Sequence, residues 1–167
     1  LDKHCTAAGG RYYINTLQYD SPSLALHRAK EWEAAYRFKL RVRTYGKPPG
    51  DAPVFLEIKR KYYDRIIKSR ACIPFDAWKP GILKSHADDF NLKSVKEREA
   101  FREFIRLYNE IGAEPKVFIR YCREAHTGIF DHYARITFDS QLCYQPATDP
   151  YNWGNNGRFI SMDSGLV

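Results

Sequence analysis

Alternation of basic and apolar residues marks part of this chain as a β-strand with two different faces. In residues 37–43 every second position is Lys or Arg, and the positions between them are Phe38, Leu40 and Val42. Successive side chains of a strand point to opposite faces, so a period of two separates the two kinds of residue. The segment therefore predicts a strand with a row of cations on one face and a buried apolar face on the other.

The same pattern recurs in residues 54–61 and 134–139, and a further expected strand at 65–73 carries Lys68 and Arg70. For one strand alone, alternating charge is more typical of a solvent-exposed surface. Repetition favours an interior face that binds a polyanion, because antiparallel pairing of these strands would otherwise crowd like charges together and destabilise the sheet. The cations that would share this face are Lys39, Arg41, Arg43, Lys59, Lys61, Lys68, Arg70 and Arg135.

Turn residues and helical periodicity complete the expected order of elements. Ser94 and Glu97 form a capping box before an amphipathic segment that ends at Gly112, so residues 94–111 predict a helix that covers the sheet. The expected elements are strands at 11–19, 36–45, 53–61, 65–73, 116–125 and 132–139, a short helix within 23–32, a loop at 146–157 and a final partial strand. The predicted fold class is α+β, mainly antiparallel β, in one domain spanning 1–167.

Composition narrows the choice of partner. The 167 residues carry a formal net charge of +7, which favours an anionic partner. The glycine motifs of P-loop and dinucleotide sites are absent, and the four Cys and five His lack zinc-site spacing. With no long apolar run and no signal peptide, the sequence predicts a soluble, cytoplasmic protein. Only net charge and tyrosine content support nucleic-acid binding, so no specific nucleic-acid partner is expected.

Two carboxylates fall within the basic segments, Glu57 beside Lys59 and Asp139 four positions beyond Arg135. Mg²⁺ and Mn²⁺ prefer oxygen ligands and can bridge a carboxylate to phosphate oxygens. A carboxylate among cations can equally be an ion-pair partner that holds them in place. Spacing alone leaves both roles open for Glu57 and Asp139.

Six segments together carry a resemblance that no single motif would establish. They are Tyr19-Asp20-Ser21-Pro22, residues 38–46, residues 54–61, Ile67-Lys68-Ser69-Arg70, Tyr121-Cys122-Arg123-Glu124 and residues 135–139. In this order they resemble the VTC domain, which is the polyphosphate polymerase domain of the vacuolar transporter chaperone complex and its bacterial relatives, within the triphosphate tunnel metalloenzymes. The resemblance covers nearly the whole chain.

The resemblance implies an eight-stranded antiparallel β-barrel with flanking helices, whose basic tunnel binds polyphosphate. The implied reaction is metal-dependent transfer of the terminal phosphoryl group of ATP onto a polyphosphate chain, with Mn²⁺ or Mg²⁺ as cofactor. A tunnel triphosphatase acting on tripolyphosphate or a nucleoside triphosphate, and a non-catalytic polyphosphate-binding module, would use the same cations and stay open as alternatives. The resemblance also leaves open whether the protein binds a membrane partner subunit and whether it is located at the cytoplasmic face of a membrane.

Carried over by position, the resemblance also implies roles for single residues. Alternation alone does not show whether Arg120 or Arg123 is the phosphate ligand, because the two lie on opposite faces of the expected strand. The resemblance favours Arg123. The implied catalytic residues are Arg41, Arg43, Lys59 and Arg135, and the implied substrate-binding residues are Lys68, Arg70 and Arg123. Alternation adds Lys39 and Lys61 to the substrate-binding residues, and spacing gives Glu57 and Asp139 as candidate metal ligands. The family's opening strand, and its closing strand with a metal-binding Glu, have no counterpart between Leu1 and Val167. We therefore expect a segment truncated at both ends, with outer strands missing and the main metal-binding Glu beyond Val167.

Overall fold

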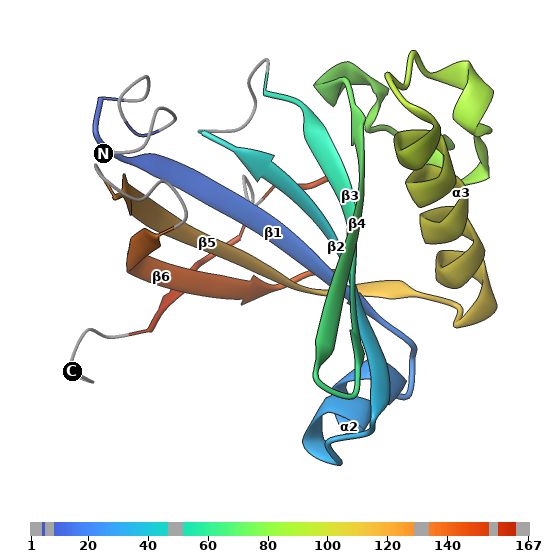
Figure 1. Cartoon of the computed structure of the whole chain (residues 1–167), viewed down its shortest axis with the longest axis horizontal. Coiled ribbons are helices and arrows are strands. Elements are labelled where there is room, and N and C mark those ends of the chain that lie inside the picture. The colour runs from blue at the N-terminus through green and yellow to red at the C-terminus, as the bar shows by residue number, and fades with distance from the viewer. Residues whose placement is uncertain (1–4, 6–8, 47–51, 129–133, 154–156, 163–167) are drawn as a thin grey trace.

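The chain folds around one strongly bent antiparallel sheet flanked by helices (Figure 1). The structure is a computed structural model, and it describes residues 5, 9–46, 52–128, 134–153 and 157–162. Its main elements are β1 (Tyr12–Asp20), α2 (Ala25–Glu31), β2 (Tyr36–Tyr45), β3 (Val54–Tyr62), β4 (Arg65–Ile73), α3 (Val95–Glu110), β5 (Glu114–Thr127), β6 (Arg135–Pro146) and β7 (Ile160–Ser161). Three 3-10 turns at Phe75–Ala77, Ile82–Lys84 and Ala87–Asp89 connect β4 to α3.

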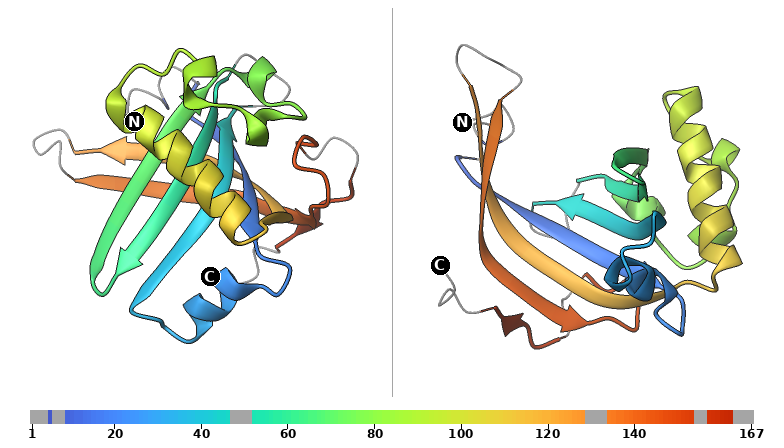
Figure 2. Two further views of the ribbon diagram at one scale, coloured as in Figure 1. Left: turned by 90° about the vertical axis from the view of Figure 1, so that its right-hand side faces the viewer. Right: turned by 60° about the horizontal axis from the view of Figure 1, so that its bottom comes forward.

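The predicted mainly antiparallel α+β class is confirmed, and so is the predicted order of strands and helices. The seven strands pair in the order β4-β3-β2-β1-β5-β6-β7. This sheet does not close on itself, since β4 and β7 are its two edges, so the described strands do not form the barrel that the resemblance implies. Figure 2 shows how the long strands β5 and β6 bend along their length. Residues 132 and 133 of an expected strand and residues 154–156 of the expected loop lie outside the described residues.

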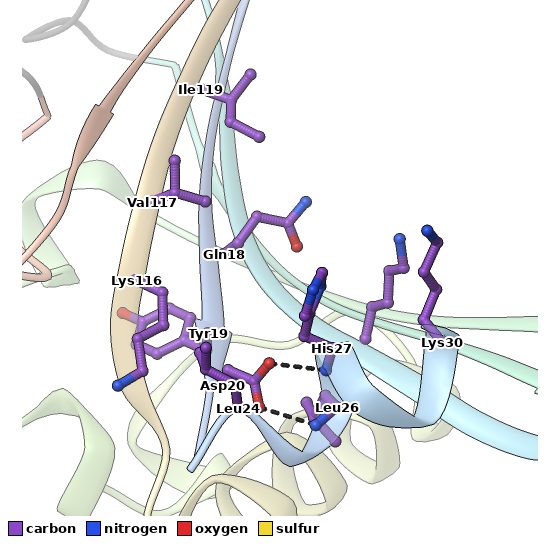
Figure 3. Close-up of a pocket in the computed structure, with 11 residues that line it drawn as sticks. Gln18, Tyr19, Asp20, Leu24, Leu26, His27, Lys30, Lys116, Val117 and Ile119 are labelled. Carbon is purple, nitrogen blue, oxygen red and sulfur yellow. Dashed lines mark hydrogen bonds between the residues drawn. The ribbon is translucent and has the colours of Figure 1, made fainter. Parts of the chain in front are cut away.

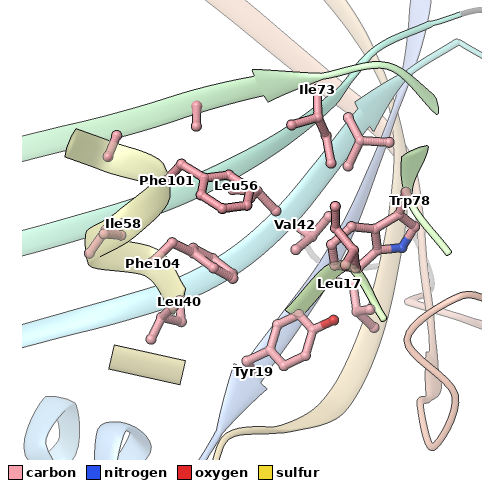
Figure 4. Packing of buried hydrophobic residues seen from close by; sticks show 14 of the residues in the cluster. Leu17, Tyr19, Leu40, Val42, Leu56, Ile58, Ile73, Trp78, Phe101 and Phe104 are labelled. Atoms are coloured by element: carbon pink, nitrogen blue, oxygen red, sulfur yellow. The ribbon is translucent and has the colours of Figure 1, made fainter. Parts of the chain in front are cut away.

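The apolar face of the sheet is buried under α3. Helix α3 packs against β3 and β4, and Figure 1 shows it on one side of these strands while β1, β5 and β6 extend away on the other. Phe101 and Phe104 on the buried side of α3 lie among Leu40, Leu56 and Ile58 (Figure 4). All five side chains are at most 1% exposed. The opposite face of β2 and β3, which carries the alternating cations, is therefore directed away from this core.

A buried carboxylate fixes the short helix α2 beside the sheet. Asp20 ends β1, and its two carboxylate oxygens accept hydrogen bonds from the backbone N–H groups of Leu26 and His27, both at 2.9 Å. The hydroxyl of Ser21 accepts a further hydrogen bond from the backbone N–H of Ala25. The Asp20-Ser21-Pro22 turn thus holds the first turn of α2 against the end of β1.

Among the described residues, no helix is both long and apolar enough to cross a bilayer.

Removal of the α3 cap is expected to cost about 1 kcal/mol of the free energy of unfolding. Ser94 is the N-cap, and its hydroxyl accepts a hydrogen bond from the backbone N–H of Glu97 at 3.2 Å. Ser94→Ala removes this acceptor, whereas Ser94→Asp retains one and should keep most of the stability. Chemical denaturation of the two variants measures the difference, and equal stability of Ser94→Ala and the unmodified protein would show that the cap contributes nothing.

Candidate polyanion-binding site

Strand register brings the cations of β2, β3 and β4 together on one face of the sheet, which we call the cationic face. Lys39 of β2 pairs with Lys59 of β3, and Lys59 pairs with Lys68 of β4. In the neighbouring row, Glu57 lies between Arg41 and Arg70. Arg43, which pairs with Phe55, and Lys61, which pairs with Arg37, lie on the same face, so the cations predicted from alternation on these three strands share one face of the sheet.

Glu57 lies at the centre of four cations and is fully buried. Nε of Arg41 donates a hydrogen bond to Glu57 Oε2 at 2.7 Å, and a guanidinium nitrogen of Arg43 lies 3.9 Å from the same oxygen. Lys68 Nζ and Arg70 Nε lie 3.0 and 3.1 Å from Oε1. Both contacts are ion pairs. We call these five residues the Glu57 cluster.

The electrostatic balance at Glu57 keeps its carboxylate ionised. Burial alone would raise the pKa of Glu57, but the positive charges of Arg41, Lys68 and Arg43 outweigh burial and hold the pKa below its ordinary value. An ionised carboxylate in turn holds the cations close together, although one negative charge cannot neutralise four positive ones. The cluster therefore keeps a surplus of positive charge on the cationic face, available to an anionic ligand.

Further contacts orient the guanidinium groups of the cluster. Arg43 donates from Nε to the hydroxyl of Thr16 on β1 at 3.1 Å. Arg70 donates to the hydroxyl of Tyr45 at 2.8 Å and stacks over the ring of Phe55, 3.6 Å from the ring centroid. Planar guanidinium groups held in this way are suited to binding two phosphate oxygens at once. Sequence alternation did not identify Thr16, Tyr45 or Phe55, because their contacts depend on pairing between strands.

Asp139 and Glu57 do not form a metal site together with other described residues. Both carboxylate oxygens of Asp139 accept hydrogen bonds from Arg123, each at 2.7 Å, and both oxygens of Glu57 face cations. Within the described ranges, no group of three His, Cys, Asp or Glu side chains could hold a metal ion. The described side chains therefore do not form a metal site by themselves, and the predicted metal contacts of Glu57 and Asp139 stay predictions.

Lys39 and Lys59 lie side by side without a carboxylate between them. Burial, the charge of Lys59 and the charge of Lys30 on α2 together lower the pKa of Lys39. The two lysines line a cavity of about 190 Å³ with Lys30, Arg37, Phe38, Lys61 and Ile66. Alternation gave no indication of Lys30, because α2 is a helix and Asp20 sets its position. This group of cations extends the positive charge of the Glu57 cluster along the cationic face.

Tripolyphosphate binding is expected to weaken as the pH rises through the lowered pKa of Lys39. Deprotonation removes one cation, and because the pKa is lowered, the loss begins at a lower pH than for an ordinary lysine. A bound anion would raise this pKa again, so binding and protonation are coupled. Calorimetric titrations over a pH series test this, with Lys39→Arg as the control because Arg stays protonated. Identical pH profiles for the variant and the unmodified protein would contradict the expectation.

The two arginines of β5 lie on opposite faces. Arg123 pairs in register with Tyr12 of β1 and Asp139 of β6, on the same side of the sheet as the cationic strands. Arg120 lies on the other side, where Nε donates to the side-chain oxygen of Asn15 at 2.7 Å and a second nitrogen donates to the carbonyl of Trp153 at 2.9 Å. Arg123 therefore lies on the side of the sheet that carries the cations, and its predicted role in binding substrate stays a prediction.

Arg135 is the predicted site residue farthest along the sheet from the Glu57 cluster. It pairs with Thr127 at the end of the β5–β6 hairpin. Arg41 pairs with Gln18 of β1, and Gln18 pairs with Val117 of β5, so Val117 is the β5 residue level with the Glu57 cluster. Ten residues of strand separate Val117 from Thr127, about 33 Å along β5. Arg135 therefore lies on the same strand as Asp139 and is not next to the Glu57 cluster.

A family model described as the VTC domain matches residues 2–163, which is nearly the whole chain. The chain belongs to the VTC domain family. A search of the curated proteins finds no match. Membership of the VTC domain family suggests a polyphosphate-related function.

Proposed function

We propose that this VTC domain is a polyphosphate polymerase, which transfers the terminal phosphoryl group of ATP onto a polyphosphate chain held on the cationic face. The observation that carries the proposal is the Glu57 cluster, in which four cations from β2 and β4 share one buried carboxylate on β3, the strand between them. The neighbouring Lys39 and Lys59 extend the same positive surface. A chain of phosphates matches this surface because it carries a negative charge at every repeat.

Phosphoryl transfer requires little covalent chemistry from a protein, so positioning and charge stabilisation can supply most of the rate. Arg41 and Arg43 are held by Glu57 and Thr16, and in the proposal their remaining N–H donors stabilise the charge on the transferred phosphoryl group. Lys59 and Lys68 neutralise the adjacent phosphates as point charges. Mn²⁺ or Mg²⁺, if required, would enter as a complex with ATP, because these ions commonly bind substrate phosphates with few protein carboxylates.

The deciding experiment incubates the full-length protein with ATP and Mn²⁺ and separates the products on a polyacrylamide gel. Long polyphosphate chains are the expected product. Release of orthophosphate without chains would replace the proposal with a triphosphatase. Binding of polyphosphate without turnover of ATP would replace it with a binding module.

A further inference from the structure

Beyond the polar Thr16 and Gln18 of β1, the face of the sheet that carries the cations becomes apolar on β5. The row of Arg41 continues through Gln18 of β1 to Val117 of β5, and the row of Arg43 continues through Thr16 to Ile119. Paired residues of an antiparallel sheet lie on the same face, so Val117 and Ile119 share the face of the two arginines. Polyphosphate is anionic along its whole length, and an apolar surface offers it no favourable contact.

A cavity of about 360 Å³ lies between this apolar surface and α2 (Figure 3). Val117 and Ile119 form one side, and Leu24 and Leu26 at the start of α2 also line it. We call this cavity the α2 pocket. Asp20 fixes the start of α2 through its two backbone hydrogen bonds, so the wall formed by Leu24 and Leu26 is already in place without a ligand. The volume falls within the range of about 300–1,000 Å³ that is typical of small-molecule sites.

The cations at the edge of the α2 pocket connect it to the phosphate-binding surface. Lys30 and Lys39 line both the α2 pocket and the smaller cavity that contains Lys59. A ligand that fills both regions must combine a compact, weakly polar group with an adjacent chain of negative charge. A nucleoside triphosphate has this composition, because its base and ribose are joined directly to its phosphates.

We infer that the α2 pocket holds the nucleoside of the donor nucleotide, with the triphosphate passing Lys39 onto the Glu57 cluster. The inference rests on the proposed function, in which ATP is the phosphoryl donor. Leu24, Leu26, Val117 and Ile119 supply the apolar contacts to the base, and the side-chain amide of Gln18 supplies both a donor and an acceptor for its edge. Tripolyphosphate lacks a nucleoside, so it uses the cations alone.

The test compares ATP with tripolyphosphate as ligands of the full-length protein by isothermal titration calorimetry. Ile119→Ala removes apolar contact area from the pocket and leaves every cation in place. We expect this variant to bind ATP about tenfold more weakly and tripolyphosphate with unchanged affinity. Val117→Phe, which fills the pocket, is a second variant with the same expected selectivity. Ile136→Ala on β6 is the matched control, because Ile136 is 62% exposed and does not line the pocket.

Equal loss of affinity for both ligands in Ile119→Ala and Val117→Phe, or no loss for either, would overturn the inference. Binding of tripolyphosphate but not ATP by the unmodified protein would also overturn it, and would leave a polyphosphate-binding role intact. Binding of neither ligand would overturn the proposed function together with the inference. Melting temperatures of the variants show whether each one is folded before its affinity is interpreted.

Discussion

Arg41→Ala is expected to reduce polyphosphate synthesis by about 10²–10³-fold while leaving the protein folded. Arg41 is oriented by its hydrogen bond to Glu57, and its side chain is still 17% exposed toward the cationic face. The substitution removes a donor aimed at the phosphates. Glu57 would keep Arg43, Lys68 and Arg70 as partners, so its carboxylate would not become an unpaired buried charge. Product gels measure synthesis, and thermal denaturation measures the fold.

Arg60→Ala is the matched control for this prediction. Arg60 lies on the same strand as Glu57 but on the opposite face, where it donates hydrogen bonds to Glu103 of α3 and to the hydroxyl of Ser69. Its loss should lower stability modestly and leave synthesis by the folded protein unchanged. If Arg41→Ala unfolds the protein, then Arg41 has a structural role. If the variant is folded and retains full synthesis, then Arg41 has no role in the reaction.

The strands and their faces could be predicted from the sequence because the signal for them is local. Alternation in residues 37–43 reports the two faces of β2 directly, and β2 spans the predicted residues 36–45. Helix α3 also begins after the predicted cap, Ser94. The three 3-10 turns between β4 and α3 were not predicted, since such short turns have no periodic pattern of their own.

The role of Glu57 could not be predicted because it depends on register between strands. The sequence shows that Glu57 is near Lys59, but only the pairing of β3 with β2 and β4 shows that Arg41 and Arg70 lie on either side of it. The α2 pocket was missed for the same reason. Its walls come from β5 and α2, which are more than 80 residues apart in sequence.

Closure of the sheet also depends on contacts that a local pattern does not encode. A barrel requires its two edge strands to pair with each other or with an intervening strand. In the described part of the chain the edges are β4 and β7, and β7 contributes only Ile160 and Ser161. The cationic face therefore lies on an open sheet, and Lys68 and Arg70 near the β4 edge are the most exposed cations of the Glu57 cluster.

Glu57→Gln is expected to lower the free energy of unfolding by about 3–5 kcal/mol. The substitution keeps the size of the side chain but leaves four crowded cations without their counter-charge. The pKa of Glu57 lies below its ordinary value, so its ionised form stabilises the folded state above the unfolded-state pKa, and this contribution is lost as the pH falls through the folded-state pKa. The stability difference between the variant and the unmodified protein should therefore shrink in acid, which chemical denaturation at several pH values would measure.

Tripolyphosphate should restore much of the stability of Glu57→Gln, because the bound anion supplies the missing negative charge. The rise in melting temperature on adding tripolyphosphate should be larger in the variant than in the unmodified protein. Glu103→Gln is the matched control, since Glu103 pairs with Arg60 and Arg106 on the far side of the sheet and its loss should not change the response to the anion. A Glu57→Gln variant that is as stable as the unmodified protein would show that the carboxylate does not hold the cations in place. A destabilised variant that tripolyphosphate does not rescue would show that the four cations do not form the anion site.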